Sequence, residues 1–142
     1  MGEYISAALR RLVVDRANYR CEYCGVPDTA TFVPHEPDHI VAHQHGGTTS
    51  ADNLAYACFE CNRYKGPNLS SIDPVTGAVT TLYSPRAQRW QDHFRWNEAV
   101  IEALTATARA TVFLLRLNDE DRVAFRANLL RRGEHLGPAE GS

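Results

Sequence analysis

The sequence contains no apolar run that approaches the ~20 residues needed for a membrane-spanning helix. Its first residues also lack the basic-then-apolar order of a secretory signal peptide. An excess of positive charge is missing too, because 15 lysines and arginines stand against 17 acidic residues, for a formal net charge of −2. We therefore expect a cytoplasmic protein with no membrane contact. Any site that binds a polyanion has to be local, since no chain-wide positive field attracts one.

Lysine is nearly absent, since Lys65 is the only one among the 15 basic residues. Contacts with phosphate would therefore come mostly from guanidinium groups, which can bind a phosphate through two N–H groups at once. The length of 142 residues and the hydrophobic content of 44% are sufficient for one compact domain with its own core.

The residue pattern divides the chain into five consecutive segments. They are residues 1–17, 18–70, 71–97, 98–136 and 137–142. Apolar residues at helical spacing predict an N-terminal amphipathic helix in the first segment. The second segment holds all four cysteines and four of the six histidines, so we expect the functional site there. The third combines a hairpin with a connector rich in arginine and aromatic residues, the fourth is predicted to form the C-terminal helices, and the last is predicted to be a flexible tail.

Several local patterns follow the second segment. The run Asp-Pro-Val-Thr-Gly at residues 73–77 predicts a turn that is followed by a short strand. Residues 98–117 and 119–133 are predicted to be helices, and Asn118 is a suitable N-cap for the second of them. The arginines and tryptophans of residues 84–97 fit either a packing surface anchored by tryptophan or a platform for nucleic acid.

The four cysteines form two Cys-x-x-Cys pairs, Cys21 with Cys24 and Cys58 with Cys61, with 33 residues between the pairs. A spacing of two residues lets a tight turn aim both sulfurs at one point, and two such turns complete a tetrahedral Zn²⁺ site with Zn–S bonds of ~2.3 Å. Because four ligands leave no open coordination position, we expect a structural zinc ion. Two disulfides or a redox-active pair are the alternatives, and the lack of a secretion signal disfavours disulfides. The separation exceeds the ~15–20 residues of a simple zinc ribbon, so further structure is inserted between the pairs.

The insertion and its end carry several short motifs. They are Asp38-His39-Ile40, Gly46-Gly47, Asn53-Leu54, and Asn62 and Lys65 after the second cysteine pair. In this order, together with the cysteine pairs, the motifs resemble the HNH endonucleases, whose ββα-metal hairpin is often braced by a four-cysteine zinc site. The resemblance covers about residues 18–66. It implies an α+β fold in which a small zinc-braced ββα-metal hairpin core is flanked by an N-terminal helix and C-terminal helices.

The resemblance assigns roles to four polar residues. His39 matches the general base, Asp38 matches the acidic metal ligand before it, Asn53 matches the residue that fixes the hairpin loop, and Asn62 matches the final motif position. Histidine is neutral often enough at pH 7 to take a proton from water. A divalent ion held by Asp38 and Asn62 could bind a phosphate oxygen and the departing 3′ oxygen. One carboxylate and one amide form a weak oxygen site, which suits Mg²⁺ or Mn²⁺ and argues against a second zinc.

The remaining candidates lie close to these residues. Arg63 or Lys65 could reach a flanking phosphate. His43 and His45 add imidazoles near the site, and metal ligation, phosphate contact and an ordinary loop position stay open for His45, whereas we favour a loop position for His43. Ala42 stands where many relatives have proline, which weakens the case for a rigid strand exit.

The expected local geometry places a constraint on the site. If residues 38–42 form a strand, Asp38 and His39 project to opposite faces, so a strand end or a bulge is needed to bring them together. Residues 59–66 are expected to form the short helix that presents Asn62 to the hairpin. His35 lies in a segment bounded by prolines and is expected to be in a surface loop.

Taken together, the sequence predicts a metal-dependent endonuclease that hydrolyses DNA phosphodiester bonds, with RNA left open as a substrate. Each polar residue alone also has a plainer explanation, such as capping a turn or a helix. The rival hypothesis is therefore a noncatalytic zinc module that binds nucleic acid or protein. Binding to DNA is expected to be weak and sensitive to salt unless a partner protein contributes, and a homodimer would suit an enzyme that cuts both strands.

Overall fold

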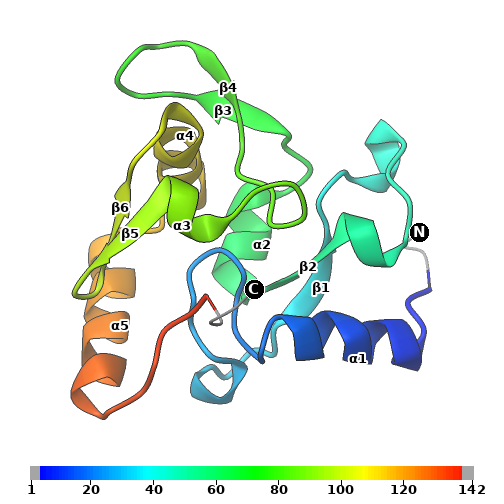
Figure 1. Cartoon of the computed structure of the whole chain (residues 1–142), viewed down its shortest axis with the longest axis horizontal. Coiled ribbons are helices and arrows are strands. Elements are labelled where there is room, and N and C mark those ends of the chain that lie inside the picture. Colours follow the sequence, from blue (N-terminus) through cyan, green and yellow to red (C-terminus); the bar gives the residue numbers. More distant parts are fainter. Residues whose placement is uncertain (1–3, 139–142) are drawn as a thin grey trace.

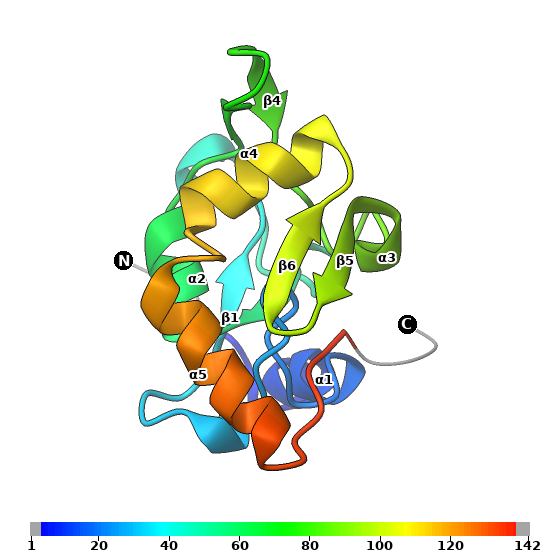
Figure 2. The same cartoon turned by 90° about the vertical axis from the view of Figure 1, so that its left-hand side faces the viewer.

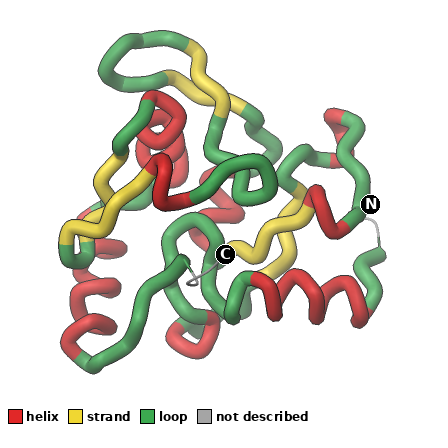
Figure 3. Tube along the Cα trace, in the orientation of Figure 1, coloured by secondary structure: helices red, strands yellow, loops and turns green. Residues whose placement is uncertain are grey.

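The computed structural model describes residues 4–138, and within them the fold is α+β, as predicted (Figures 1 and 3). Three antiparallel hairpins and five α-helices make up this part of the chain. In chain order the elements are α1 (Ala7–Arg16), η1 (Asp28–Ala30), β1 (Glu36–His39), η2 (His43–His45), η3 (Ala51–Asn53), β2 (Leu54–Ala57), α2 (Phe59–Lys65), β3 (Ser70–Ile72), β4 (Val79–Thr81), α3 (Trp90–His93), β5 (Phe94–Asn97), β6 (Val100–Ala103), α4 (Ala106–Leu115) and α5 (Glu120–Arg131). None of the helices described is long and apolar enough to cross a membrane.

The hairpin of β1 and β2 is followed directly by α2, which gives the expected two strands and a helix. β1 ends at His39 instead of extending over residues 38–42. The reason is that the backbone N–H of Val41 is bound by the side chain of Asn53 at 2.9 Å, so the chain leaves the strand ladder there. His39 is therefore the last residue of β1, and Asp38 lies one residue before the strand end.

The two faces of this hairpin have different neighbours. Leu54 is buried with Val13 of α1, whereas Ala55 belongs to the larger core that also contains the four cysteines. Asp38 pairs with Ala55 and His39 pairs with Leu54, and directly paired residues of an antiparallel hairpin project to the same face. His39 thus lies on the face covered by α1, and Asp38 lies on the opposite face, towards α2 (Figure 1).

The predicted N-terminal helix is present as α1. It begins after Ser6, and the hydroxyl of Ser6 caps the helix by accepting a hydrogen bond from the N–H of Leu9 at 3.1 Å. The outer edge of β2 is protected as well, because Glu22 bonds both backbone groups of Tyr56, and the side chain of Arg16 donates to the carbonyl of Leu54 at 2.5 Å.

The predicted turn at residues 73–77 connects β3 and β4. The carboxylate of Asp73 accepts from the N–H of Val75 at 2.9 Å, and its backbone carbonyl accepts from Gly77 at 2.8 Å. Arg109 of α4 binds the same carboxylate through two N–H groups at 2.8 and 2.9 Å. Burial opposes ionisation, yet the Arg109 hydrogen bonds outweigh it and hold the pKa of Asp73 well below its usual range.

The prediction of one helix over residues 98–117 is wrong for its first part. β5 and β6 form a hairpin there, with Trp96 opposite Ile101, and a helix begins only at Ala106. Its N-cap is Thr105, which accepts from the N–H of Ala108 at 3.1 Å. The hairpin forms because Glu98 adopts a positive φ at the turn and a distant side chain, that of Asn118, binds its second strand.

Asn118 does not cap the last helix, contrary to the prediction. Its amide group accepts from the N–H of Ile101 at 2.9 Å and donates to the carbonyl of Ile101 at 2.7 Å, so it acts as an extra strand partner for β6. Asp119 holds the N-cap position of α5, without a side-chain cap bond. Figure 2 shows α4 and α5 together on the side of the molecule that also carries α2.

The predicted flexible tail lies mostly outside the described residues, which end at 138. Its first residue, Gly137, donates its N–H to the carbonyl of Gly25 at 2.8 Å and accepts from the indole of Trp96 at 2.7 Å. The chain is therefore anchored at this point on the first cysteine turn and on β5.

Candidate active site

The four cysteines meet at one buried point of the core. Their sulfurs all lie within 4.8 Å of one another, and those of Cys24 and Cys58 are 3.7 Å apart. Four sulfurs around a zinc ion at ~2.3 Å would be separated by about 3.8 Å, so the spacing suits a tetrahedral site. Backbone N–H groups point at the sulfurs of Cys21 and Cys58 at 3.4–3.5 Å, as is expected of thiolates. No disulfide joins them, so the cluster is compatible with a structural zinc ion.

A cation that the sequence did not reveal borders this cluster. Arg122 of α5, which is 8% exposed, donates to the sulfur of Cys61 at 3.1 Å and lies 3.7 Å from that of Cys58. The same guanidinium also donates to the carbonyl of Leu115 at 2.7 Å, at the end of α4. Burial by itself lowers the pKa of Arg122, but the neighbouring thiolates outweigh it and raise the pKa above its usual value. Arg122 therefore compensates negative charge on the cluster and connects it to both C-terminal helices.

The Asp38 carboxylate is nearly buried, with 13% of its side chain exposed. The ammonium group of Lys65, only 3% exposed, lies 3.2 Å from Oδ2 of Asp38 and also donates to the backbone carbonyl of His39 at 3.2 Å. The contact with Oδ2 is an ion pair without hydrogen-bond geometry, which leaves that buried oxygen without a hydrogen-bond partner among residues 4–138. Burial raises the pKa of Asp38, and the positive charge of Lys65 only partly opposes this.

Lys65 therefore has a different place from the one expected. The sequence analysis assigned it to a DNA phosphate, but the structure buries it against Asp38. The reason is its position on α2, which brings the stem of the side chain over β1. Asn62 lies three residues earlier on α2, near the same helix face, and is half-buried.

The imidazole of His39 is fixed by a residue that the sequence analysis missed. Its Nε2 lies 2.8 Å from the hydroxyl of Thr49 in the loop between η2 and η3. A threonine ten residues away in a loop carries no sequence signal for this role. If Nε2 donates its hydrogen to Thr49, then Nδ1 holds the lone pair that can accept a proton.

Asn53 bonds the loop backbone, as the sequence analysis expected. Its side chain accepts from the N–H of Val41 at 2.9 Å and donates to the carbonyls of Val41 and Thr48 at 3.0 and 2.7 Å. Gly47 passes close beside it, because a Cβ at that position would lie 1.7 Å from the carbonyl oxygen of Val41. Only glycine fits this approach, so the Gly46-Gly47 motif and Asn53 hold the loop closed over the end of β1.

The other candidates are less closely connected to the pair Asp38 and His39. Arg63 is exposed on α2, and His45 is exposed at the end of η2. His43 begins the same short helix. His35 was expected in a surface loop but is 2% exposed, because its Nε2 bonds the carbonyl of Val26 at 2.8 Å and its ring packs on Tyr56.

Comparison with known proteins assigns the class of this segment. Residues 21–68 match the family model described as HNH endonuclease, which confirms the resemblance found in the sequence for the segment from the first cysteine pair to the end of α2. A CRISPR-associated endonuclease Cas9 from Corynebacterium diphtheriae is 44% identical over 132 aligned residues. The alignment covers 83% of this chain but only 12% of that relative, so the chain spans about an eighth of the protein it matches. No solved structure matches the chain. These findings support nuclease-type activity in general terms.

Proposed function

We propose that this protein is a metal-dependent endonuclease that hydrolyses DNA phosphodiester bonds. In this proposal His39 is the general base, Asp38 and Asn62 hold one divalent cation, Mg²⁺ or Mn²⁺, and Asn53 fixes the loop over the site. The observation that supports the proposal is the contact at 3.2 Å between Lys65 of α2 and Asp38, because Asn62 lies three residues before Lys65 on the same helix.

The residues present fit a hard divalent cation. Oδ2 of Asp38 is buried and its partner is the ammonium group of Lys65 at 3.2 Å, so a divalent cation could take the place of that positive charge. Amide and carboxylate oxygens are ligands that Mg²⁺ and Mn²⁺ prefer. A cation bound here would supply charge stabilisation for the phosphoryl group and for the leaving oxygen. Lys65 has to share the carboxylate with the cation or move away from it.

The protein's own groups would perform the remaining steps. Thr49 holds Nε2 of His39, so that Nδ1 can accept a proton from a water placed in line with the scissile bond. Asn53 keeps the loop that carries Thr49 closed over β1 through three hydrogen bonds. Cys21, Cys24, Cys58 and Cys61, with a structural zinc, would fix α2 relative to the hairpin. Arg63 and His45, both exposed, are proposed to contact the DNA backbone.

The proposed setting follows from this chemistry. Thiolate ligands persist in a reducing compartment, and a DNA substrate is found there too, so both support a cytoplasmic location. A chain with one such site that cuts both strands of a duplex would act as two copies.

Cleavage of supercoiled plasmid tests the proposal. Purified protein is incubated with plasmid in Mg²⁺ or Mn²⁺, and His39→Ala is compared with His135→Ala, which removes an exposed histidine elsewhere. We expect nicked or linear product from the wild type and from His135→Ala, and loss of at least about 100-fold in rate from His39→Ala. Equal inactivity of all three proteins in both metals would favour the noncatalytic zinc module, and a single-stranded RNA substrate in parallel distinguishes DNA from RNA.

A further inference from the structure

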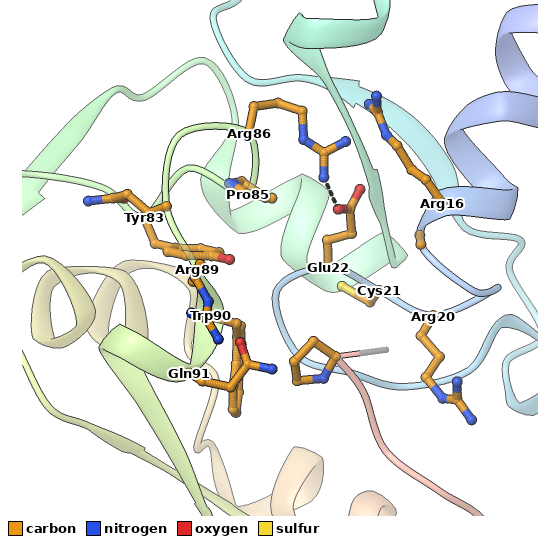
Figure 4. A pocket seen from close by; sticks show the side chains of 13 residues that line it. Arg16, Arg20, Cys21, Glu22, Tyr83, Pro85, Arg86, Arg89, Trp90 and Gln91 are labelled. Atoms are coloured by element: carbon orange, nitrogen blue, oxygen red, sulfur yellow. Dashed lines mark hydrogen bonds and ion pairs between the residues drawn. The ribbon is translucent and has the colours of Figure 1, made fainter. Parts of the chain in front are cut away.

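A group of arginines from outside the segment that matches the HNH family lines a cavity at the border of that segment. A cavity of about 190 Å³ opens between the end of α1, the first cysteine turn and residues 83–91 (Figure 4). Arg16, Arg86 and Arg89 line it, and among residues 4–138 Glu22 is the carboxylate in its lining. A fourth arginine, Arg20, extends away from the others and donates to the carbonyl of His135 at 3.2 Å.

The carboxylate of Glu22 does not neutralise this site. One of its oxygens is ion-paired with Arg86, and the other accepts the backbone N–H of Tyr56 at 2.8 Å. The guanidinium groups of Arg16 and Arg86 therefore lie near a carboxylate that is already fully engaged, and Arg89 lines the cavity from the segment before α3. Arg89 is exposed, and its side chain has no hydrogen bond or ion pair within residues 4–138.

Two of the guanidinium groups compete for the same partner. Arg16 and Arg86 both donate to the carbonyl of Leu54, at 2.5 and 3.3 Å. The Nε of Arg16 is buried and has no partner in the described part of the chain. Burial, and then the charge of Arg86, lower the pKa of Arg16. An anion in the cavity would satisfy the unpaired N–H and offset the repulsion between the two cations.

The cavity lies close to His39, the proposed catalytic base. Leu54, whose carbonyl both arginines bind, is the residue paired with His39 across the hairpin, and both side chains project to the α1 face. Paired Cα atoms are ~4.5–5.5 Å apart, so the guanidinium of Arg16 is within about 10 Å of the Cα of His39.

We propose that Arg16, Arg86 and Arg89 form a binding site for a DNA backbone phosphate close to the bond that is cut. This inference rests on the proposed function for its substrate. Guanidinium groups suit the task because they bind phosphate through paired N–H groups. The site would hold the substrate strand beside the outer edge of β2, from where the strand could reach the end of β1 at His39.

Binding of a labelled DNA duplex, measured against salt concentration, tests the proposal apart from catalysis. All proteins carry His39→Ala and no divalent cation is added, so the DNA stays intact. Arg89→Gln and Arg16→Gln are compared with Arg131→Gln, which removes the same charge from an exposed position on α5. Each phosphate contact contributes about 0.9 to the slope of log K against log salt, so losing one should raise Kd about five- to tenfold at 0.1 M salt.

The proposal predicts that Arg89→Gln and Arg16→Gln each lower the slope by about 0.9, while Arg131→Gln keeps Kd within about twofold of the parent. Unchanged slopes for both pocket variants, an equal loss from Arg131→Gln, or no salt-dependent binding by the parent would overturn it. Should Arg16→Gln unfold, Arg89→Gln decides, because the Arg89 side chain has no bonded partner to lose within residues 4–138. Plasmid cleavage by the wild type tests the proposed function separately, so one idea can fail while the other stands.

Discussion

Replacing Arg122 with methionine tests whether the C-terminal helices contribute to the cysteine cluster. The change keeps most of the apolar stem and removes the charge that lies 3.1 Å from the sulfur of Cys61. Four thiolates around Zn²⁺ carry a formal charge of −2, and the structure buries Arg122 directly against two of the sulfurs. Loss of the positive charge should weaken zinc binding, while the apolar stem of methionine keeps most of the surrounding packing.

The magnitude follows from the bonds that are lost. A charge-assisted hydrogen bond contributes ~1.5–3 kcal/mol, and losing an outer partner of a metal ligand typically lowers metal affinity by ~10–100-fold. A tenfold change corresponds to about 1.4 kcal/mol, so the two ranges agree. The guanidinium also donates to the carbonyl of Leu115 at 2.7 Å, and that carbonyl would lose a partner in the variant. We therefore expect Arg122→Met to bind zinc ~10–100-fold more weakly.

Competition with a chromophoric zinc chelator measures this affinity directly. Arg131→Met is the matched control, because it removes an exposed arginine from the last turn of the same helix. The control should stay within about threefold of the wild type. Equal zinc affinity for Arg122→Met and the wild type would refute the reasoning, and so would an equal loss in the control.

Three further variants test other parts of the structure. Cys58→Ser should lower the zinc content and the melting temperature together, because the metal-bound hairpin depends on that ligand, and full zinc retention in elemental analysis would contradict this. Lys65→Met should lower the free energy of unfolding by about 3–5 kcal/mol, because it leaves Asp38 charged and unpaired, while adding Asp38→Asn should recover part of the loss in a denaturant titration. Asn118→Ala should cost about 2 kcal/mol, because both hydrogen bonds to Ile101 are lost, and an unchanged denaturation midpoint would argue against the proposed clamp.

The parts of the fold that the sequence predicted well are those set by local spacing. The cysteine pairs, the turn at residues 73–77 and the short helix after Cys58 each follow from residues within a few positions of one another. The hairpin of β5 and β6 does not follow from local spacing. Its second strand also fits a helical pattern of apolar residues, and the contact that decides between them comes from Asn118, 17 residues from Ile101.

The same distinction applies to the candidate site. Motif order made Asp38, His39, Asn53 and Asn62 the candidates, and the family model matches the segment that contains them, while their roles stay predictions. The ion pair between Lys65 and Asp38 was not predictable, since it depends on how α2 lies over β1. Thr49, which bonds His39, comes from a loop, and Arg122, which bonds the cysteine sulfurs, comes from a distant helix. Such partners leave no periodic signal in the sequence.

The two faces of the β1–β2 hairpin set a geometric condition on any substrate. Asp38 projects towards α2 and His39 projects towards α1, so neither face alone can present both groups to one phosphate. They can converge only past the end of β1, where the ladder stops at His39 and the closed loop of Gly47 and Asn53 turns the chain away. Under the proposed function, a scissile phosphate would lie across the strand end and not along either face. The loop needs glycine at position 47 for the same geometry. A side chain there would clash with the carbonyl of Val41, push the loop off the strand end and move the hydroxyl of Thr49 that bonds His39.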